Sequence, residues 1–130
     1  MPEKQTIERA RQDEAEGKAP TTQAGEFVRE EIEHVREGKH GARSTKQAIA
    51  IGLSKARRAG VALPPPSDAS PATRKAAARD TRRGRAKAKP VSAKRSRSVR
   101  AALRREGRSA TSRSALSRQA RSAARRRRAR

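Results

Sequence analysis

The chain has 130 residues, of which 35 are Lys or Arg and 13 are Asp or Glu, so its formal net charge is +22. It contains no Cys, Trp or Tyr, and its Leu, Ile, Val and Phe residues together make up roughly 11% of the chain. Such a composition buries too little apolar surface to offset the entropy of ordering one compact domain of this length. A dry catalytic pocket is therefore not expected, and we predict no enzymatic activity, no cofactor and no small-molecule substrate.

Residues 1–20 are assigned to a charged N-terminal helix and linker. The helix is expected over 3–16, with Pro2 near its start and Gly17 at its end. Its only apolar stripe is Ile7 and Ala10, so it is expected to be marginal.

Residues 21–63 are predicted to form a helical hairpin. In its first helix, over about 22–37, one face repeats at the 3.6-residue period and carries the packing residues Phe27, Val28, Ile32 and Val35. A short loop follows, which places the next helix antiparallel to the first.

The second helix of the hairpin is expected over about 45–59. Ser44 and Gln47 have the spacing of a capping box, and Gly60 is the expected residue just after the helix. Ile49 and Leu53, four residues apart, are its packing residues.

Titratable residues of the hairpin are interpreted as structural. Glu30, Glu31 and Glu33 belong to an acidic helix face rather than to a catalytic carboxylate pair. His34 is placed on the helix surface and His40 in the loop, at an unusual spacing for metal ligands in a chain without Cys. No catalytic residue and no metal site is predicted.

The stretch from about 24 to 63 resembles an uncharacterised family of small bacterial proteins. The resemblance is carried by a Gly/Lys-rich loop followed by the helix KQAIAIGLSKAR, here residues 46–57. The family is classed as a domain of unknown function, sometimes with nucleic-acid-binding or plasmid-stabilisation labels. The resemblance therefore implies no catalytic residue.

The charge is concentrated after this module. Residues 1–63 carry 12 basic and 10 acidic side chains, whereas residues 64–130 carry 23 basic side chains against Asp68, Asp80 and Glu106. A Pro-rich linker over 64–70 joins the two parts, and triple proline favours an extended connection. The Ala/Arg-rich tail, 71–130, resembles linker-histone tails in composition only.

The fold class expected is mostly α, with the small hairpin followed by a disordered or conditionally helical basic tail. Ser70, Ser92 and Ser112 could cap tail helices, because Ala and Arg are good helix formers. Dense like charge opposes these helices until a polyanion neutralises it.

The tail predicts histone-like, largely sequence-nonspecific binding of nucleic acid, with DNA favoured over RNA. Arg grips phosphate in a bidentate manner, and no rigid scaffold for reading base edges is apparent. The residues expected to contact nucleic acid are Arg74, Lys75, Arg82, Arg83, Arg95, Arg97, Arg100, Arg104, Arg105, Arg108, Arg113, Arg118, Arg121, Arg125, Arg126, Arg127 and Arg128.

The alternative is a protein-interaction or regulatory module, of the antitoxin or plasmid-maintenance type, that acts through the 24–63 hairpin. The hairpin is also the candidate surface for self-association. Residues 1–10 lack an apolar segment, and Val99 with Leu103 is too little for a membrane-binding face. A cytoplasmic, nucleoid-associated protein without a membrane partner is expected.

Overall fold

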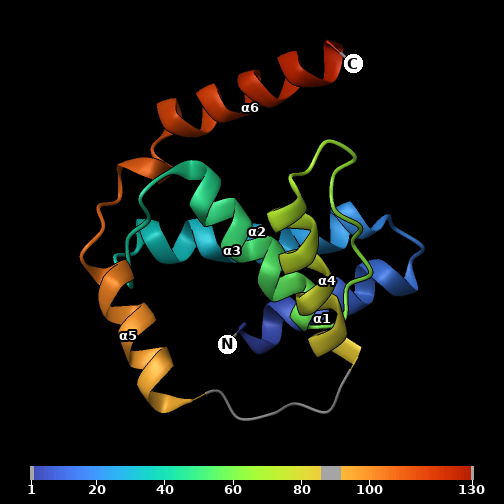
Figure 1. Cartoon of the computed structure of the whole chain (residues 1–130), viewed down its shortest axis with the longest axis horizontal. Coiled ribbons are helices and arrows are strands. Elements are labelled where there is room, and N and C mark those ends of the chain that lie inside the picture. The colour runs from blue at the N-terminus through green and yellow to red at the C-terminus, as the bar shows by residue number, and fades with distance from the viewer. Residues whose placement is uncertain (1, 86–91, 130) are drawn as a thin grey trace. The chain divides into compact units, whose positions relative to one another are not determined.

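A computed structural model describes residues 2–85 and 92–129 of the chain (Figure 1). Within these ranges all regular secondary structure is helical, which confirms the mostly α prediction. The elements are α1 (Lys4–Ala15), α2 (Pro20–Arg36), α3 (Thr45–Arg58), α4 (Pro71–Arg85), α5 (Ala93–Arg104), the short 3-10 helix η1 (Ser109–Thr111) and α6 (Arg113–Arg128). The helices α2 and α3 reproduce the predicted hairpin helices to within two residues at each end.

The chain divides into two compact units. The first combines Met1–Glu30 with Ala50–Pro90, and the second combines Glu31–Ile49 with Val91–Arg130. Both units therefore join part of the predicted hairpin to part of the basic half of the chain.

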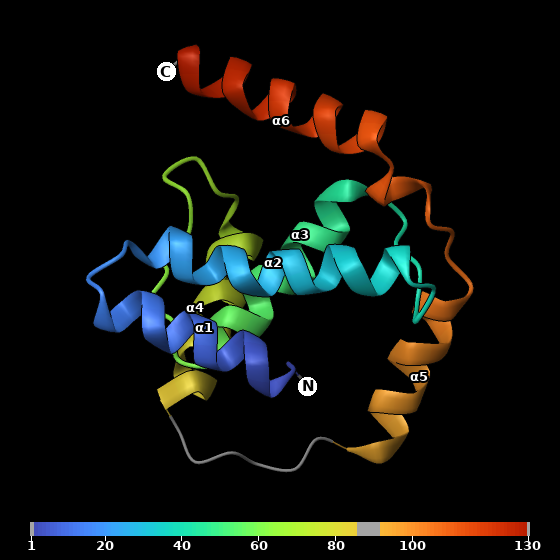
Figure 2. The ribbon, with the colours of Figure 1, turned by 180° about the vertical axis from the view of Figure 1, so that it is seen from behind.

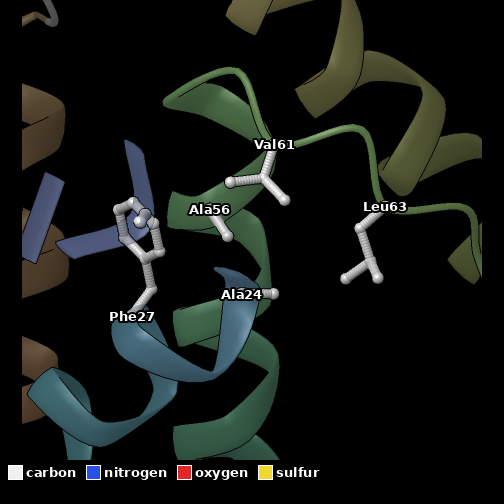
Figure 3. Packing of buried hydrophobic residues seen from close by; sticks show 6 residues of the cluster. Ala24, Phe27, Ala56, Val61 and Leu63 are labelled. Carbon is white, nitrogen blue, oxygen red and sulfur yellow. The ribbon is translucent and has the colours of Figure 1, made fainter. Parts of the chain in front are cut away.

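The first unit has a small core in which three of the six buried residues are alanine. Phe27 of α2 is fully buried, and Ala24 of α2 and Ala56 of α3 are almost as inaccessible. Figure 3 shows these side chains gathered with Val61 and Leu63, which follow α3. The sequence pattern identified Phe27, and Ala56 lies one turn after Leu53 on the predicted apolar face, whereas Ala24 was missed because alanine gives a weak hydrophobic signal.

The helix α1 belongs to this core. It runs beside the first part of α2 (Figure 2), and its Ala10 is buried with Ile7 partly buried against the same cluster. The backbone N–H of Glu3 also donates to Oε1 of Glu30 at 2.6 Å. The helix α1, which was expected to be marginal, is thus docked through Ile7 and Ala10, the two apolar residues of its predicted stripe.

Glycines allow the helices of the first unit to approach closely. A Cβ atom at Gly52 of α3 would lie 2.7 Å from Cα of Val28 in α2, and one at Gly84 of α4 would lie 2.1 Å from the carbonyl oxygen of Arg57. Such distances are well inside van der Waals contact, so any side chain at these positions would force the helix backbones apart.

Asp80 attaches α4 to α3. Its side chain is 7% exposed and accepts hydrogen bonds from Ser54 Oγ at 2.8 Å and from Arg58 Nε at 2.9 Å. Ala77, one turn earlier, is 3% exposed. The buried face of α4 is thus formed by an acidic residue and an alanine, although the helix is otherwise basic.

The turn after α3 is held by a buried arginine. Arg57 is 8% exposed, and its Nε donates to the carbonyl oxygen of Leu63 at 2.9 Å. Burial lowers the pKa of the Arg57 guanidinium below its ordinary value, while the charge of Asp80 opposes that shift. This arginine is a structural residue, since its donors are directed at the main chain.

The caps predicted for α3 are present. Ser44 Oγ accepts from the Gln47 backbone N–H at 3.1 Å, and Gly60 after the helix has a φ of +102°. The reciprocal bond differs from an ideal capping box, because Gln47 Oε1 accepts from the N–H of Arg43 at 2.6 Å instead of from Ser44. Thr45 additionally donates to the carbonyl of Ala110, which the local motif could not predict.

In the second unit, residues 103–111 pack on the turn between α2 and α3. The N–H groups of Gly41 and Ala42 donate to the carbonyl oxygens of Leu103 and Gly107, at 2.8 and 2.9 Å. Ala42 and Ala110 share a small buried cluster with Val35. We call residues 41 and 42 the seat, because they hold this later segment through the main chain.

The six hairpin packing residues differ in burial. Phe27 and Val35 are fully buried, whereas Val28, Ile32, Ile49 and Leu53 are partly exposed. The remaining core is supplied by alanines and by the segment after α3.

Candidate nucleic-acid interface

All of the tail residues predicted to contact nucleic acid lie within the described residues and are exposed. Their exposure follows from the acid-poor composition of the tail, since few carboxylates are present there to pair with them. Their side chains are therefore accessible to an external polyanion.

The helix α6 carries the densest array of these cations. It contains seven arginines and no acidic residue, and none of its residues is buried. Arg118, Arg121, Arg125 and Arg128 recur at spacings of three and four residues, which places them on one face of the helix. We call these four residues the arginine row.

The geometry of the arginine row suits a linear polyanion. Arg118 and Arg128 are ten residues apart, so the row extends over about 15 Å of helix. One DNA strand presents a phosphate about every 3.4 Å along its axis. The row therefore spans the rise of about four phosphates.

A second cluster of cations surrounds the start of α6. Arg36, Arg108 and Arg113 line a shallow surface hollow together with Thr111 and Ser112. Arg36 Nε donates to the carbonyl oxygen of Thr111 at 3.2 Å, and Arg108 Nη1 donates to that of Arg36 at 3.3 Å. We call Arg36, Arg108 and Arg113 the arginine hollow.

The arginine hollow has the chemistry of a phosphate site. Ser112 caps α6 by accepting from the N–H of Ala115 at 3.1 Å, so the helix begins beside the three guanidinium groups. Guanidinium donors and the positive end of a helix both favour phosphate oxygens.

The sequence identified Arg108 and Arg113 of this hollow but missed Arg36. Arg36 ends α2, in the near-neutral part of the chain, and joins the hollow only because residues 103–111 pack on the seat. No local signal in the sequence could have found it.

Some of the predicted contact residues also hold the fold. Arg74 Nε donates to the carbonyl oxygen of Ala69 at 3.1 Å, and its Nη2 donates to that of Ser67. Arg108 is engaged with Arg36, as described above. These two arginines have structural roles in addition to any contact with a ligand.

The carboxylates and histidines of the hairpin are arranged differently from the sequence interpretation. Glu30 and Glu31 are buried, at 4% and 0% exposure, whereas Glu33 is exposed. His34 and His40, taken as unrelated surface and loop residues, lie in the second unit with both rings near Glu31. The two histidines and this carboxylate are the metal-ligating side chains that the second unit brings together.

Among residues 2–85 and 92–129, no helix is both long enough and apolar enough to cross a membrane.

Residues 14–67 match the model of a family described as a family of unknown function (DUF6496). The match covers the stretch whose resemblance to an uncharacterised family the sequence indicated, and it confirms that resemblance. It includes α2 and α3 but not α5 or α6. No curated protein and no solved structure matches the chain.

Proposed function

We propose that the protein binds nucleic acid without strong sequence preference, DNA in preference to RNA, through its Arg-rich C-terminal half in a histone-like manner. The observation that carries the proposal is α6, whose seven arginines are exposed and accompanied by no acidic residue. An exposed cationic helix gains free energy from releasing the counterions condensed on a polyanion.

The charge of the C-terminal half sets the length of DNA that it can neutralise. Residues 64–130 have a net charge of +20. Duplex DNA carries about one negative charge per 1.7 Å, so this charge matches roughly 34 Å, or about ten base pairs.

Low sequence preference follows from the side chains. Base-specific contacts require donors held rigidly against base edges, whereas the arginine row stands on a helix with no buried residue. The tail also lacks aromatic residues, which weakens stacking on single-stranded bases.

The first test is a binding titration of the full chain with a fluorescent 20-base-pair duplex at several salt concentrations. If eight to twelve cations contact phosphate, log K falls with log salt at a slope of roughly −7 to −11. Duplexes of unrelated sequence are expected to bind alike. A slope near zero contradicts the proposal.

The sharper test changes the arginine row alone. Substituting Arg118, Arg121, Arg125 and Arg128 by Gln removes four charges from one helix face and is expected to reduce the slope by roughly 2 to 4. Because α6 buries no residue, the fold should survive.

The matched control removes four charges elsewhere. Lys4, Arg9, Arg11 and Arg43 are exposed residues of the near-neutral part, and substituting them by Gln lowers the net charge equally. This control is expected to leave the slope within about one unit of the native value. Equal losses in both variants would indicate diffuse attraction rather than contact through α6.

The competing hypothesis, a regulatory module acting through the hairpin, draws support from the family match, which spans α2 and α3. The absorbance of the purified protein distinguishes the two hypotheses. Without Trp or Tyr the polypeptide absorbs little in the near ultraviolet, so strong absorbance at 260 nm that nuclease and high salt remove would indicate bound nucleic acid. Preparations free of it, with a flat salt titration, would favour the regulatory module.

A further inference from the structure

Three metal-ligating side chains converge in the second unit, outside the arginine-rich surfaces. His40 Nε2 lies 3.3 Å from Glu31 Oε2, and His34 Nδ1 lies 3.8 Å from Glu31 Oε1. One ligand atom from each residue lies within 4.8 Å of the other two. The ring centroids of the two histidines are 6.0 Å apart, with the ring planes at 83°.

The orientation of His40 determines what its second nitrogen can do. Its Nδ1 lies 2.9 Å from the carbonyl oxygen of Gly41. A carbonyl only accepts hydrogen bonds, so Nδ1 carries the hydrogen and Nε2 is the nitrogen directed at Glu31. This arrangement, with one ring N–H fixed by a main-chain carbonyl, is the one that orients metal-ligating histidines in proteins.

The contact between His40 and Glu31 needs a hydrogen or a metal ion between the two facing atoms. In the neutral ring fixed by Gly41, the Nε2 lone pair would face a carboxylate oxygen at 3.3 Å, which is repulsive. The Glu31 side chain is 1% exposed, so water cannot easily separate the two groups. A proton shared by the two groups or a metal ion bound by both resolves the repulsion.

The spacing of the ligand atoms suits a metal ion. For bonds of about 2.0–2.1 Å, neighbouring ligand atoms of a tetrahedral zinc site are about 3.4 Å apart. The distance of 3.3 Å between His40 Nε2 and Glu31 Oε2 lies close to that value, and one ligand atom of His34 lies within 4.8 Å of both other ligand atoms. Two imidazoles and one carboxylate also form a donor set that zinc uses with water as the fourth ligand.

The geometry points to a site for a divalent transition-metal ion, zinc by ligand chemistry, formed by Glu31, His34 and His40. Glu31 and His34 stand on adjacent turns of α2, and His40 comes from the turn that follows it. Two imidazole ligands with one carboxylate favour Zn²⁺ over Mg²⁺ or Ca²⁺, which prefer oxygen ligands. The two histidines are the only ones in the chain, and Cys is absent.

The site adjoins the seat. Gly41 supplies the carbonyl that orients His40, and the N–H groups of Gly41 and Ala42 hold Leu103 and Gly107. A metal ion that joins His40 to α2 therefore immobilises the turn on which residues 103–111 pack. The site is independent of nucleic-acid binding and stabilises the second unit whether or not that function is correct.

The experiment titrates the full chain with Zn²⁺ alone at pH 7.5, in a buffer that does not chelate metal. Isothermal calorimetry is expected to show one Zn²⁺ per chain. Substituting His40 by Gln is expected to weaken binding by about 100-fold or more, as loss of a direct ligand exceeds the 10–100-fold typical of outer residues. The matched control is Glu33→Gln, an exposed carboxylate on the same helix, whose affinity should equal that of the native chain.

Imidazole nitrogen NMR of the native chain keeps the test independent of how the variants fold. Added Zn²⁺ is expected to shift His40 Nε2 and His34 Nδ1 while His40 Nδ1 keeps its hydrogen. Imidazole resonances that respond to pH but not to Zn²⁺ would overturn the proposal, because a proton would then be the cation between these groups.

Hydrogen exchange tests the connection to the seat. Saturating Zn²⁺ is expected to slow exchange of the Gly41 and Ala42 amides by about tenfold or more, since a ligand that binds only the folded form stabilises it. Zinc that binds with unchanged exchange at both amides would overturn this part of the proposal.

Discussion

The helices α4 and α6 have similar contents of Ala and Arg but differ in burial. Both are rich in Ala and Arg, both lie in the basic half of the chain, and both begin at a serine cap. Yet α4 buries Ala77 and Asp80, whereas α6 buries nothing. A high content of Ala and Arg, and the helix propensity that it gives, therefore do not decide which basic helix docks.

The difference comes from a few side chains on one face of α4. Asp80 supplies an acceptor for Ser54 and Arg58, Ala77 is small enough to be buried, and Gly84 allows the backbones to meet. The helix α6 has no acid and no glycine. One carboxylate and one glycine thus separate a structural helix from a helix left available for a ligand.

The largest expected effect is that of Gly84→Ala. The new Cβ would lie 2.1 Å from the Arg57 carbonyl oxygen, a main-chain atom that cannot rotate away. We expect α4 to separate from α3 and the free energy of unfolding to fall by about 3 kcal/mol, the upper range for overpacking. Chemical denaturation followed by circular dichroism measures it.

The control for this prediction is Gly25→Ala in α2. A Cβ at Gly25 meets nothing within 4 Å, so only helix propensity changes. Propensity favours Ala over Gly by roughly 0.5–1 kcal/mol in a helix interior. The two substitutions should therefore change stability in opposite directions, and a gain from both would contradict the close packing of α4.

The second prediction concerns Asp80→Ala. This substitution leaves Ser54 and Arg58 without their acceptor and is expected to lower the free energy of unfolding by about 2 kcal/mol, the range for hydrogen bonds to a charged group. Thermal unfolding at low and high salt measures it.

Asp68→Ala is the matched control for Asp80→Ala, because Asp68 is an exposed acid in the same half of the chain. It should change stability by less than about 0.5 kcal/mol. Similar losses from both acids would mean that general charge balance, and not the contact with α3, holds α4 in place.

Local signals predicted much of this fold. The serine caps at Ser44, Ser70, Ser92 and Ser112 accept the expected backbone N–H groups, and Gly60 adopts the expected positive φ. These features act within one turn of the chain, so their spacing is visible in the sequence. The family resemblance was also visible, because it is carried by a continuous stretch of sequence.

Long-range contacts were the part that the sequence could not predict. Arg36 joins Arg108 across 72 residues, and Asp80 meets Ser54 across 26. The burial of Glu31 between two histidines depends on how the turn after α2 folds back. Packing through alanine adds to the difficulty. Alanine occurs both in the buried helix faces and in the exposed tail, so its presence does not predict burial.

The smallest expected effects come from removing the serine caps of α4 and α6, and they should differ between the two helices. Ser70→Ala and Ser112→Ala each remove one hydrogen bond to a backbone N–H, from Thr73 and from Ala115 respectively. Loss of such a cap costs about 1 kcal/mol of helix stability. For α4, whose buried face belongs to the first unit, this cost should appear in the global free energy of unfolding.

For α6 the same cost should stay local, because a helix without buried residues can open while the remainder stays folded. Ser112→Ala is therefore expected to leave the unfolding midpoint unchanged and to speed hydrogen exchange along α6. An equal drop in midpoint for both variants would show that α6 unfolds together with the core. Added DNA should then restore slow exchange in α6 of the Ser112 variant, since neutralising the arginines removes the like-charge repulsion that opposes the helix.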